Sequence, residues 1–236
     1  MTNNKIEQHI KYCLPLKAEE LLYEAFKFYN KDVEIAVSFG AEDVVLIDMV
    51  SKLNIDIGIF TIDTQRLNDE TYDLMKEIKQ KYNIKIEILY PNELSVKKMI
   101  EAKGINLFYD SVENRKECCG VRKIFPLKKK LNTLKGWITG VRSDQNENRS
   151  EFKKVELDEN WENSLIKYNP LVDWSYEQVF EYIKKHKVPY NKLHDQGYPS
   201  IGCKPCTRAI KKGDDLRSGR WSWENEGNTE CGLHIK

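Results

Sequence analysis

A chain of 236 residues with a formal net charge of +1 suits one α/β domain with at most a small appendage. Hydrophobic residues make up 40% and charged residues 32%, which allows a core and gives no overall bias toward nucleic acid or membrane. No apolar run approaches the ~20 residues of a membrane span, and the opening MTNNKIEQHI lacks the apolar core of a signal peptide, so we expect a cytoplasmic protein.

Short apolar runs alternate with amphipathic segments in the first part of the chain, and this pattern predicts βαβ units. We predict helices over residues 18–29, 42–53 and 68–82, with Asn68 in the capping position of the third. Strands are predicted over residues 34–39, 56–62 and 85–90. Right-handed crossovers then give an open, largely parallel twisted sheet with helices on both faces.

The second part of the chain carries weaker signals. Strands are predicted over residues 137–140 and 165–168, and a helix over 175–185 that begins after Ser175 and ends before Pro189. From residue 191 onward the chain is rich in glycine, proline and polar residues, with little periodicity. We expect a single domain over residues 1–236, with residues 191–236 as a loop-rich segment within it.

Two predicted strands end in residues suited to ligand binding. Ser38, Phe39 and Gly40 follow the first strand, where the backbone N–H groups of small residues and the next helix can approach an anion. Asp63 and Thr64 follow the second strand and share the same sheet edge. The segment lacks the full Walker A pattern, so an ordinary P-loop NTPase is not supported, and a plain strand-to-helix turn stays open.

The positions of the cysteines suggest a metal site rather than disulfides. Cys118 and Cys119 are adjacent, and Cys203 and Cys206 form a C-x-x-C; we expect both pairs in loops. Four thiols suit zinc or an iron–sulfur cluster. Adjacent cysteines are awkward for one tetrahedral ion, whereas a cubane offers them separate iron atoms, which favours [4Fe–4S]. Cys13 has no motif around it.

Basic residues follow both cysteine pairs and could stabilise a negatively charged cluster or bind a phosphate or sulfate group. Lys123 comes shortly after the first pair, and Arg217 and Arg220 come after the second. Near the end of the chain, Cys231 stands beside a glycine, with His234 three positions further on as a group able to stabilise a thiolate or an anion.

Together these segments resemble the adenylyl-sulfate and phosphoadenylyl-sulfate reductase family. The matching pieces run from Ser38 to His234: S-F-G-A-E-D, D-T-x-R-L-x-x-E-T-Y, C-C-G-V-R-K-x-x-P-L, W-I-T-G-V-R-x-D-Q, N-P-L-x-D-W, V-P-Y-N-x-L-H, G-Y-P-S-I-G-C-K-P-C-T, R-S-G-R-W and E-C-G-L-H. The resemblance implies an adenine-nucleotide α-hydrolase-like fold. It also implies a cluster-bearing enzyme that reduces adenylyl sulfate, because members without the four cysteines typically need the 3′-phosphorylated substrate.

The resemblance also assigns expected roles to residues of this chain. Cys231 would be the nucleophile, and the cluster ligands would be Cys118, Cys119, Cys203 and Cys206. Residues expected to contact the substrate are Lys123, Arg217, Arg220 and His234 at the phosphosulfate, Arg142 nearby, Ser38, Phe39 and Gly40 at the nucleotide, and Asp63 and Thr64 near the adenosine.

The implied reaction has two stages and needs a thiol donor. Attack of the Cys231 thiolate on the sulfur of adenylyl sulfate releases AMP and leaves an S-sulfocysteine, which thioredoxin then resolves to sulfite. The expected partners are therefore adenylyl sulfate and thioredoxin, with neither nucleic acid nor membrane; a homo-oligomer is left open.

Three rival functions are kept, and one departure from the family pattern bears on the first. The family usually has D-T-G-R-L, whereas Gln65 stands here in place of glycine; if the glycine serves a turn with positive φ, glutamine costs roughly 1 kcal/mol or more. This puts strictness for adenylyl sulfate in doubt, so a phosphoadenylyl-sulfate or dual-specificity reductase is the first rival.

The second rival, a tRNA-thiolating ligase, would typically show S-G-G-x-D-S at the first loop. The third rival, a non-enzymatic nucleotide sensor, leaves R-S-G-R-W unexplained.

Overall fold

One six-stranded sheet organises the molecule. The computed structural model describes residues 3–145, 149–211 and 213–224. The strands are β1 (Val33–Val37), β2 (Gly58–Ile62), β3 (Glu87–Leu89), β4 (Gly136–Ile138), β5 (Val155–Asp158) and β6 (Leu165–Tyr168), in the spatial order β3-β2-β1-β4-β6-β5. Every neighbouring pair is parallel except β5–β6. The predicted open, largely parallel sheet is confirmed, and the antiparallel edge strand β5 was not predicted.

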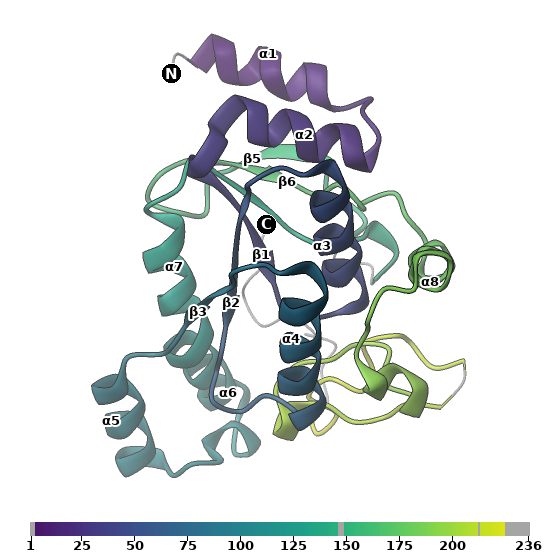
Figure 1. Cartoon of the computed structure of the whole chain (residues 1–236). Helices are drawn as coiled ribbons and strands as arrows, with labels where there is room; N and C mark the ends of the chain where they lie inside the picture. Colours follow the sequence, from purple (N-terminus) through teal and green to yellow (C-terminus); the bar gives the residue numbers. More distant parts are fainter. Residues whose placement is uncertain (1–2, 146–148, 212, 225–236) are drawn as a thin grey trace.

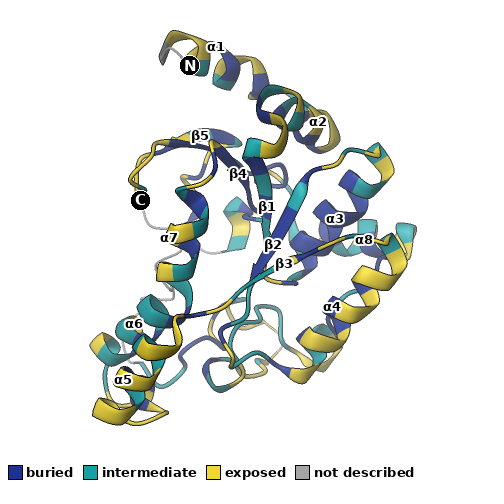
Figure 2. Cartoon of the chain, turned by 60° about the vertical axis from the view of Figure 1, so that its left-hand side comes forward, coloured by how far each residue is buried: buried dark blue, intermediate teal, exposed yellow. Residues whose placement is uncertain are grey.

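Helices cover both faces of this sheet, as predicted (Figure 1). The larger core cluster joins the strands to α2 (Ala18–Tyr29), α3 (Ala41–Leu53), α4 (Asp69–Tyr82) and α8 (Tyr176–His186). On the other face α7 (Phe125–Leu131) packs on the sheet. Alternation along β2 explains the two layers, because Ile59 joins the first cluster and Phe60 the second. Figure 2 shows the central strands β1, β2 and β4 largely buried between helices whose outer faces are exposed, whereas the edge strand β3 is partly exposed.

The strand order reverses between β1 and β4, and this reversal places the site. β2 and β3 follow on one side of β1, while β4, β6 and β5 lie on the other. The connections after β1 and β4 therefore diverge at the carboxyl ends of these strands. Open α/β sheets bind ligands in the crevice that such a reversal creates.

Four α-helices and one short π-helix were not predicted from the sequence. The helices are α1 (Asn3–Cys13), α5 (Glu93–Lys103), α6 (Val112–Cys119) and α7. The expectation that both cysteine pairs lie in loops is wrong for Cys118 and Cys119, which end α6 and run into a short π-helix, Gly120–Ile124. α6 buries only Arg115 and Cys118, so it lacks the apolar periodicity that identifies a helix.

Helix ends agree with the predictions to within a residue or two, but one cap differs. Ser175 accepts a hydrogen bond from the backbone N–H of Gln178 and begins α8 as expected. Asn68 precedes α4 without a side-chain cap; its amide instead donates to the carbonyl of Gly202 (3.0 Å). No helix in the described part of the chain is long and apolar enough to cross a membrane.

Gln65 occupies the left-handed backbone region, with φ of 62°, as the comparison with D-T-G-R-L led us to expect. We predict that Gln65→Gly raises the free energy of unfolding by up to about 1 kcal/mol, because glycine adopts this conformation without strain. Among the described residues, the side chain of Gln65 makes one long hydrogen bond, which its Oε1 accepts from Arg122 Nη1 (3.4 Å). Denaturant unfolding measures the change. Gln65→Ala is the control, since it removes the same contact, keeps the strain and should give no gain.

Candidate active site

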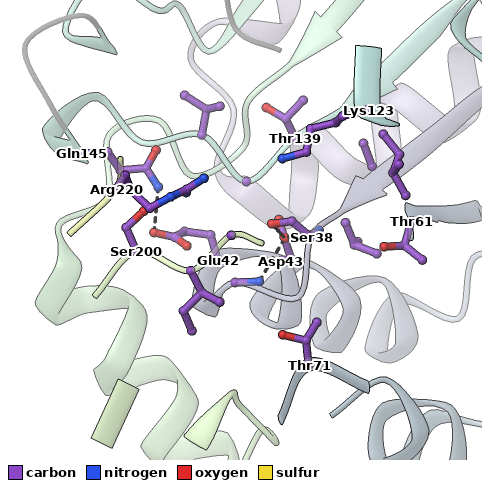
Figure 3. A pocket seen from close by; sticks show the side chains of 18 of the residues that line it. Ser38, Glu42, Asp43, Thr61, Thr71, Lys123, Thr139, Gln145, Ser200 and Arg220 are labelled. Carbon is purple, nitrogen blue, oxygen red and sulfur yellow. Dashed lines mark hydrogen bonds between the residues drawn. The ribbon is translucent and has the colours of Figure 1, made fainter. Parts of the chain in front are cut away.

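A cavity of about 200 Å³ lies at the carboxyl ends of β1 and β4, where the strand order reverses. Ser38 and Gly40 line it from the loop after β1, and Thr139 and Gly140 line it after β4. The opposite wall comes from two distant segments, residues 199–203 and 216–220. The sheet thus supplies one side of the cavity and the C-terminal loops supply the other (Figure 3).

The carboxylate of Asp43 fixes the conformation of the loop after β1. Asp43, in the first turn of α3, accepts hydrogen bonds from the Ser38 N–H (2.6 Å), the Ser38 hydroxyl (2.8 Å) and the Gly40 N–H (3.3 Å). The backbone N–H groups of Ser38 and Gly40, which the sequence suggested as donors to an anion, therefore bond to Asp43 instead. Phe39, between them, is buried in the core rather than in the cavity wall. The loop can shape the nucleotide side of the cavity, but the anion needs other donors.

Burial raises the pKa of Asp43 from 3.8 to about 6, against the hydrogen bonds from Ser38 and Gly40 that favour its charged form. A raised folded-state pKa means that the stability contribution is fully present below 3.8 and is lost as the pH rises through about 6. Relative to Asp43→Asn, the wild-type free energy of unfolding should therefore fall between these two pH values and then level off. Denaturant unfolding of both proteins from pH 4 to pH 7 measures the difference. A difference that grows in favour of the wild type with rising pH would contradict this prediction.

A buried polar group lies beside this loop. Arg142 Nε donates to Glu42 Oε1 (2.7 Å), and Gln145 Nε2 donates to the same oxygen (3.0 Å). Arg142 also pairs with Asp144 and lies over the ring of Tyr176. Arg142 does line the cavity, as expected for a substrate-side residue, but its guanidinium is engaged by two carboxylates. Its contact with Glu42 fixes that carboxylate at the cavity wall.

Besides Arg142, the cations that line the cavity are Lys123, Arg149, Arg217 and Arg220, and three of them come from predicted anion-binding positions: Lys123, Arg217 and Arg220. Lys123 lies on the π-helix, a distortion that is frequent at functional sites. Ser200 Oγ accepts long hydrogen bonds from Nη1 of both Arg217 and Arg220 (3.4 Å each), so one hydroxyl orients the two guanidinium groups. Figure 3 shows Arg220 beside Ser200, with Lys123 entering from another segment. Such a set suits an anion with several oxygens.

A second, smaller cavity contains the predicted thiols. Cys118, Cys119, Cys203 and Cys206 all line it, and so do Arg66, Arg115 and Arg122. Thr64 Oγ1 lies 3.2 Å from Cys203 Sγ, and Arg122 Nη1 donates to the Thr64 carbonyl (2.9 Å). Burial raises the pKa of Cys118, and burial together with neighbouring cysteines raises that of Cys206 to about 12. Three residues, Thr64, Lys123 and Cys203, line both cavities.

The donor set of the second cavity fits a thiolate-ligated group. Two segments distant in sequence bring four free cysteines to one small space, and three arginines offset the negative charge that four thiolates would carry. Within the described residues, no group of three or more His, Cys, Asp or Glu side chains is arranged to hold a single metal ion. A cluster differs from one ion in this respect, because each thiolate can bind its own iron.

The remaining predicted residues are placed as follows. Asp63 does not line either cavity; its carboxylate accepts from the Gln65 N–H (2.7 Å) and the Tyr72 hydroxyl (2.9 Å) and so shapes the turn. Cys231 and His234 lie outside the described residues. Sequence reasoning missed Glu42 and Asp43. Asp43 follows Gly40 by three positions, the spacing of a capping box, and this signal could have identified it.

Comparisons with known proteins agree with this arrangement. The family model described as phosphoadenosine phosphosulfate reductase domain matches residues 32–209. The chain is 46% identical over 217 residues to an adenosine 5′-phosphosulfate reductase of Allochromatium vinosum, covering 92% of this chain and 84% of that protein. The protein of the same name from Burkholderia cepacia is 44% identical over 219 residues, with 93% and 86% covered. The crystal structure of phosphoadenylyl-sulfate reductase from Candida auris, a phosphate complex, superposes with a TM-score of 0.72 at 27% identity, covering 89% of this chain and 98% of that one.

Proposed function

Because the chain belongs to the phosphoadenosine phosphosulfate reductase family, we propose that it reduces adenylyl sulfate to sulfite and AMP in assimilatory sulfate reduction. The observation that carries the proposal is the position of Lys123, which lines both the cation-rich cavity and the cysteine cavity. We take the whole chain as one reductase domain, with residues 191–236 as a segment within it, acting in the cytoplasm.

In the first stage, the thiolate of Cys231 attacks the sulfur of adenylyl sulfate. A sulfur–sulfur bond forms, the bond between sulfur and the bridging oxygen breaks, and AMP leaves with that electron pair. Attack by one anion on another needs cations on the sulfate oxygens, and we assign this task to Lys123, Arg217 and Arg220, which line the cavity. His234 is assigned to the same anion. The nucleotide lies toward Ser38 and Gly40, beside Thr64, with Glu42 fixed by Arg142.

In the second stage, a dithiol protein, thioredoxin, supplies two electrons. One of its thiolates attacks Sγ of Cys231 and displaces sulfite, which leaves a mixed disulfide. Its second thiol attacks that disulfide, so that thioredoxin leaves oxidised and Cys231 regains its thiol. The electrons come from thiols, and no other redox group has to change its oxidation state.

The four cysteines of the second cavity are proposed to hold a [4Fe–4S] cluster. Bound there, the cluster would supply a fixed charge beside Lys123 and would tie the end of α6 to the Cys203–Cys206 turn. Thr64 contacts the Cys203 sulfur of that turn, and Arg122 in turn donates to the Thr64 carbonyl. Iron and acid-labile sulfide measured on anaerobically prepared protein, with zinc as the alternative, test this assignment.

The proposed activity is tested by an anaerobic assay of sulfite released from adenylyl sulfate with thioredoxin and purified holoprotein. Phosphoadenylyl sulfate is the comparison substrate at equal concentration. Turnover of adenylyl sulfate at a higher kcat/KM than that of its 3′-phosphorylated form is expected. Faster turnover of the phosphorylated form would support the rival specificity, and release of sulfite from neither would reject the reductase assignment.

A further inference from the structure

Arg66 follows β2 and reaches the wall of the cysteine cavity. Its Nη1 donates to the Ile105 carbonyl (3.1 Å), and its Nη2 donates to Asn106 Oδ1 (2.8 Å). Its Cζ lies 5.4 Å from the ring centroid of Phe108, a residue of the core cluster that contains Cys118 and Cys206. Two hydrogen bonds and one ring contact therefore hold the guanidinium at a defined place on the cavity wall.

Arg66 is attached to both chain segments that supply the cysteines. Its side chain holds residues 105–106, which lead through a short turn into α6 and so to Cys118 and Cys119. Its backbone carbonyl accepts a hydrogen bond from the Lys204 N–H (2.8 Å), and Lys204 lies inside the C-x-x-C turn of the second pair. One residue thus joins the approach to the first cysteine pair to the middle of the second.

The three arginines of the cysteine cavity differ in whether a carboxylate offsets their charge. Arg115 donates from Nε and Nη2 to the two carboxylate oxygens of Glu224, each at 2.8 Å, so its charge is already paired. Arg122 donates to the Thr64 carbonyl, and Arg66 donates to two neutral oxygens. In the part of the chain that the structure describes, neither of these last two guanidinium groups forms an ion pair with a carboxylate. Their charge is therefore available to an anionic group held by the thiols.

We propose that Arg66 retains the cluster through its charge, which the bonds to residues 105–106 hold at the wall of the cysteine cavity. The inference rests on the proposed function, in which the four cysteines bind a [4Fe–4S] cluster. Four thiolates give such a cluster a net negative charge, and a fixed cation beside it favours the bound state. Removal of this charge favours opening of the site and release of iron. The effect of one partly buried charge is about tenfold.

A neutral hydrogen bond between the same two segments allows charge to be separated from attachment. The Tyr109 hydroxyl donates to the Pro205 carbonyl (3.0 Å), so it also joins the approach of α6 to the C-x-x-C turn. Tyr109→Phe removes this bond and keeps the ring, whose contacts with Phe108 and Trp223 remain. If attachment alone retained the cluster, this variant would behave as a variant of Arg66 does.

The experiment compares wild-type holoprotein with Arg66→Gln, which keeps a hydrogen-bonding side chain but loses the charge, and Arg66→Lys, which keeps the charge but loses the fork. Tyr109→Phe is the matched control. Iron and acid-labile sulfide are first measured on each anaerobically prepared protein. The rate of iron release to an uncharged chelator, 2,2′-bipyridine, is then followed by the loss of the visible absorbance of the cluster. No turnover is needed for this measurement.

Support for the proposal is iron release about tenfold faster in Arg66→Gln, or isolation of that variant without a cluster, with Arg66→Lys and Tyr109→Phe both within about threefold of wild type. Release from Arg66→Gln within threefold of wild type overturns it. Arg66→Lys or Tyr109→Phe as fast as Arg66→Gln also overturns it, because attachment rather than charge would then retain the cluster. A wild-type protein that contains no iron and sulfide rejects the proposed cluster itself, and the role of Arg66 with it.

Discussion

Replacement of Cys231 by serine is expected to abolish formation of the covalent sulfo-adduct while leaving nucleotide binding intact. Serine has a similar volume, but its hydroxyl does not ionise near neutral pH and is a far weaker nucleophile than a thiolate. The rate of adduct formation, followed by intact mass with adenylyl sulfate, should fall at least ~1,000-fold. AMP affinity should change by less than about twofold, since the nucleotide side of the cavity is built by the sheet.

Cys13→Ala is the matched control for this experiment. Cys13 is fully buried, its sulfur lies 3.5 Å from His9 Nε2, and it lines neither cavity. It should form the adduct at the wild-type rate. An adduct that persists in Cys231→Ser, at another cysteine or on serine, would remove Cys231 from the mechanism.

Local sequence signals were sufficient for the sheet and for the helices that have a buried stripe. In α2, Leu21, Leu22 and Ala25 recur at helical spacing and face the core, and both ends of this helix were predicted correctly. The same reasoning failed for α6, which is stabilised by the Ser111 cap and by tertiary contacts of Arg115 and Cys118. The Ser111 cap is local, but the partner of Arg115, Glu224, lies far away in the chain.

For the candidate site, residue types were easier to predict than their contacts. The sequence indicated that Lys123, Arg217 and Arg220 would serve one anion, and the structure brings them to one cavity. We did not predict that Asp43 takes the amides of the first loop, although its three-residue spacing from Gly40 is that of a capping box. The sequence could not indicate the pairing of Arg115 with Glu224, since neither residue belongs to a recognisable motif and they lie far apart in sequence.

The two cavities depend on each other through shared residues. Thr64 contacts the Cys203 sulfur, and the segment that contains Cys203 continues from Ser200 and Gly202, which support the arginines of the first cavity. A change in the cysteine turn therefore moves the anion site as well. Under the proposed mechanism, in which a dithiol partner supplies the electrons, this coupling would be a physical reason for four thiols beside the anion site.

Gly202→Ala is expected to raise KM for adenylyl sulfate about 30-fold by displacing Arg220. A Cβ at this position would lie 2.3 Å from Arg220 Nη2 and 2.5 Å from its Cζ, so the guanidinium has to move. Gly202 does not have a positive φ, which means that space, rather than backbone conformation, requires glycine here. Loss of one charge-assisted contact costs about 2 kcal/mol, which corresponds to that factor. Steady-state kinetics with both Gly202→Ala and Arg220→Ala measures the effect, and the two variants should resemble each other.

Gly120→Ala provides the matched control for Gly202→Ala. It lies next to Cys119, as Gly202 lies next to Cys203, but a Cβ there would meet no atom within 4 Å. Its KM should stay within about twofold of wild type, at equal iron and sulfide content. If Gly202→Ala binds substrate as tightly as Gly120→Ala does, Arg220 does not hold the sulfate from its observed position, and the anion must depend on Lys123 and Arg217 instead.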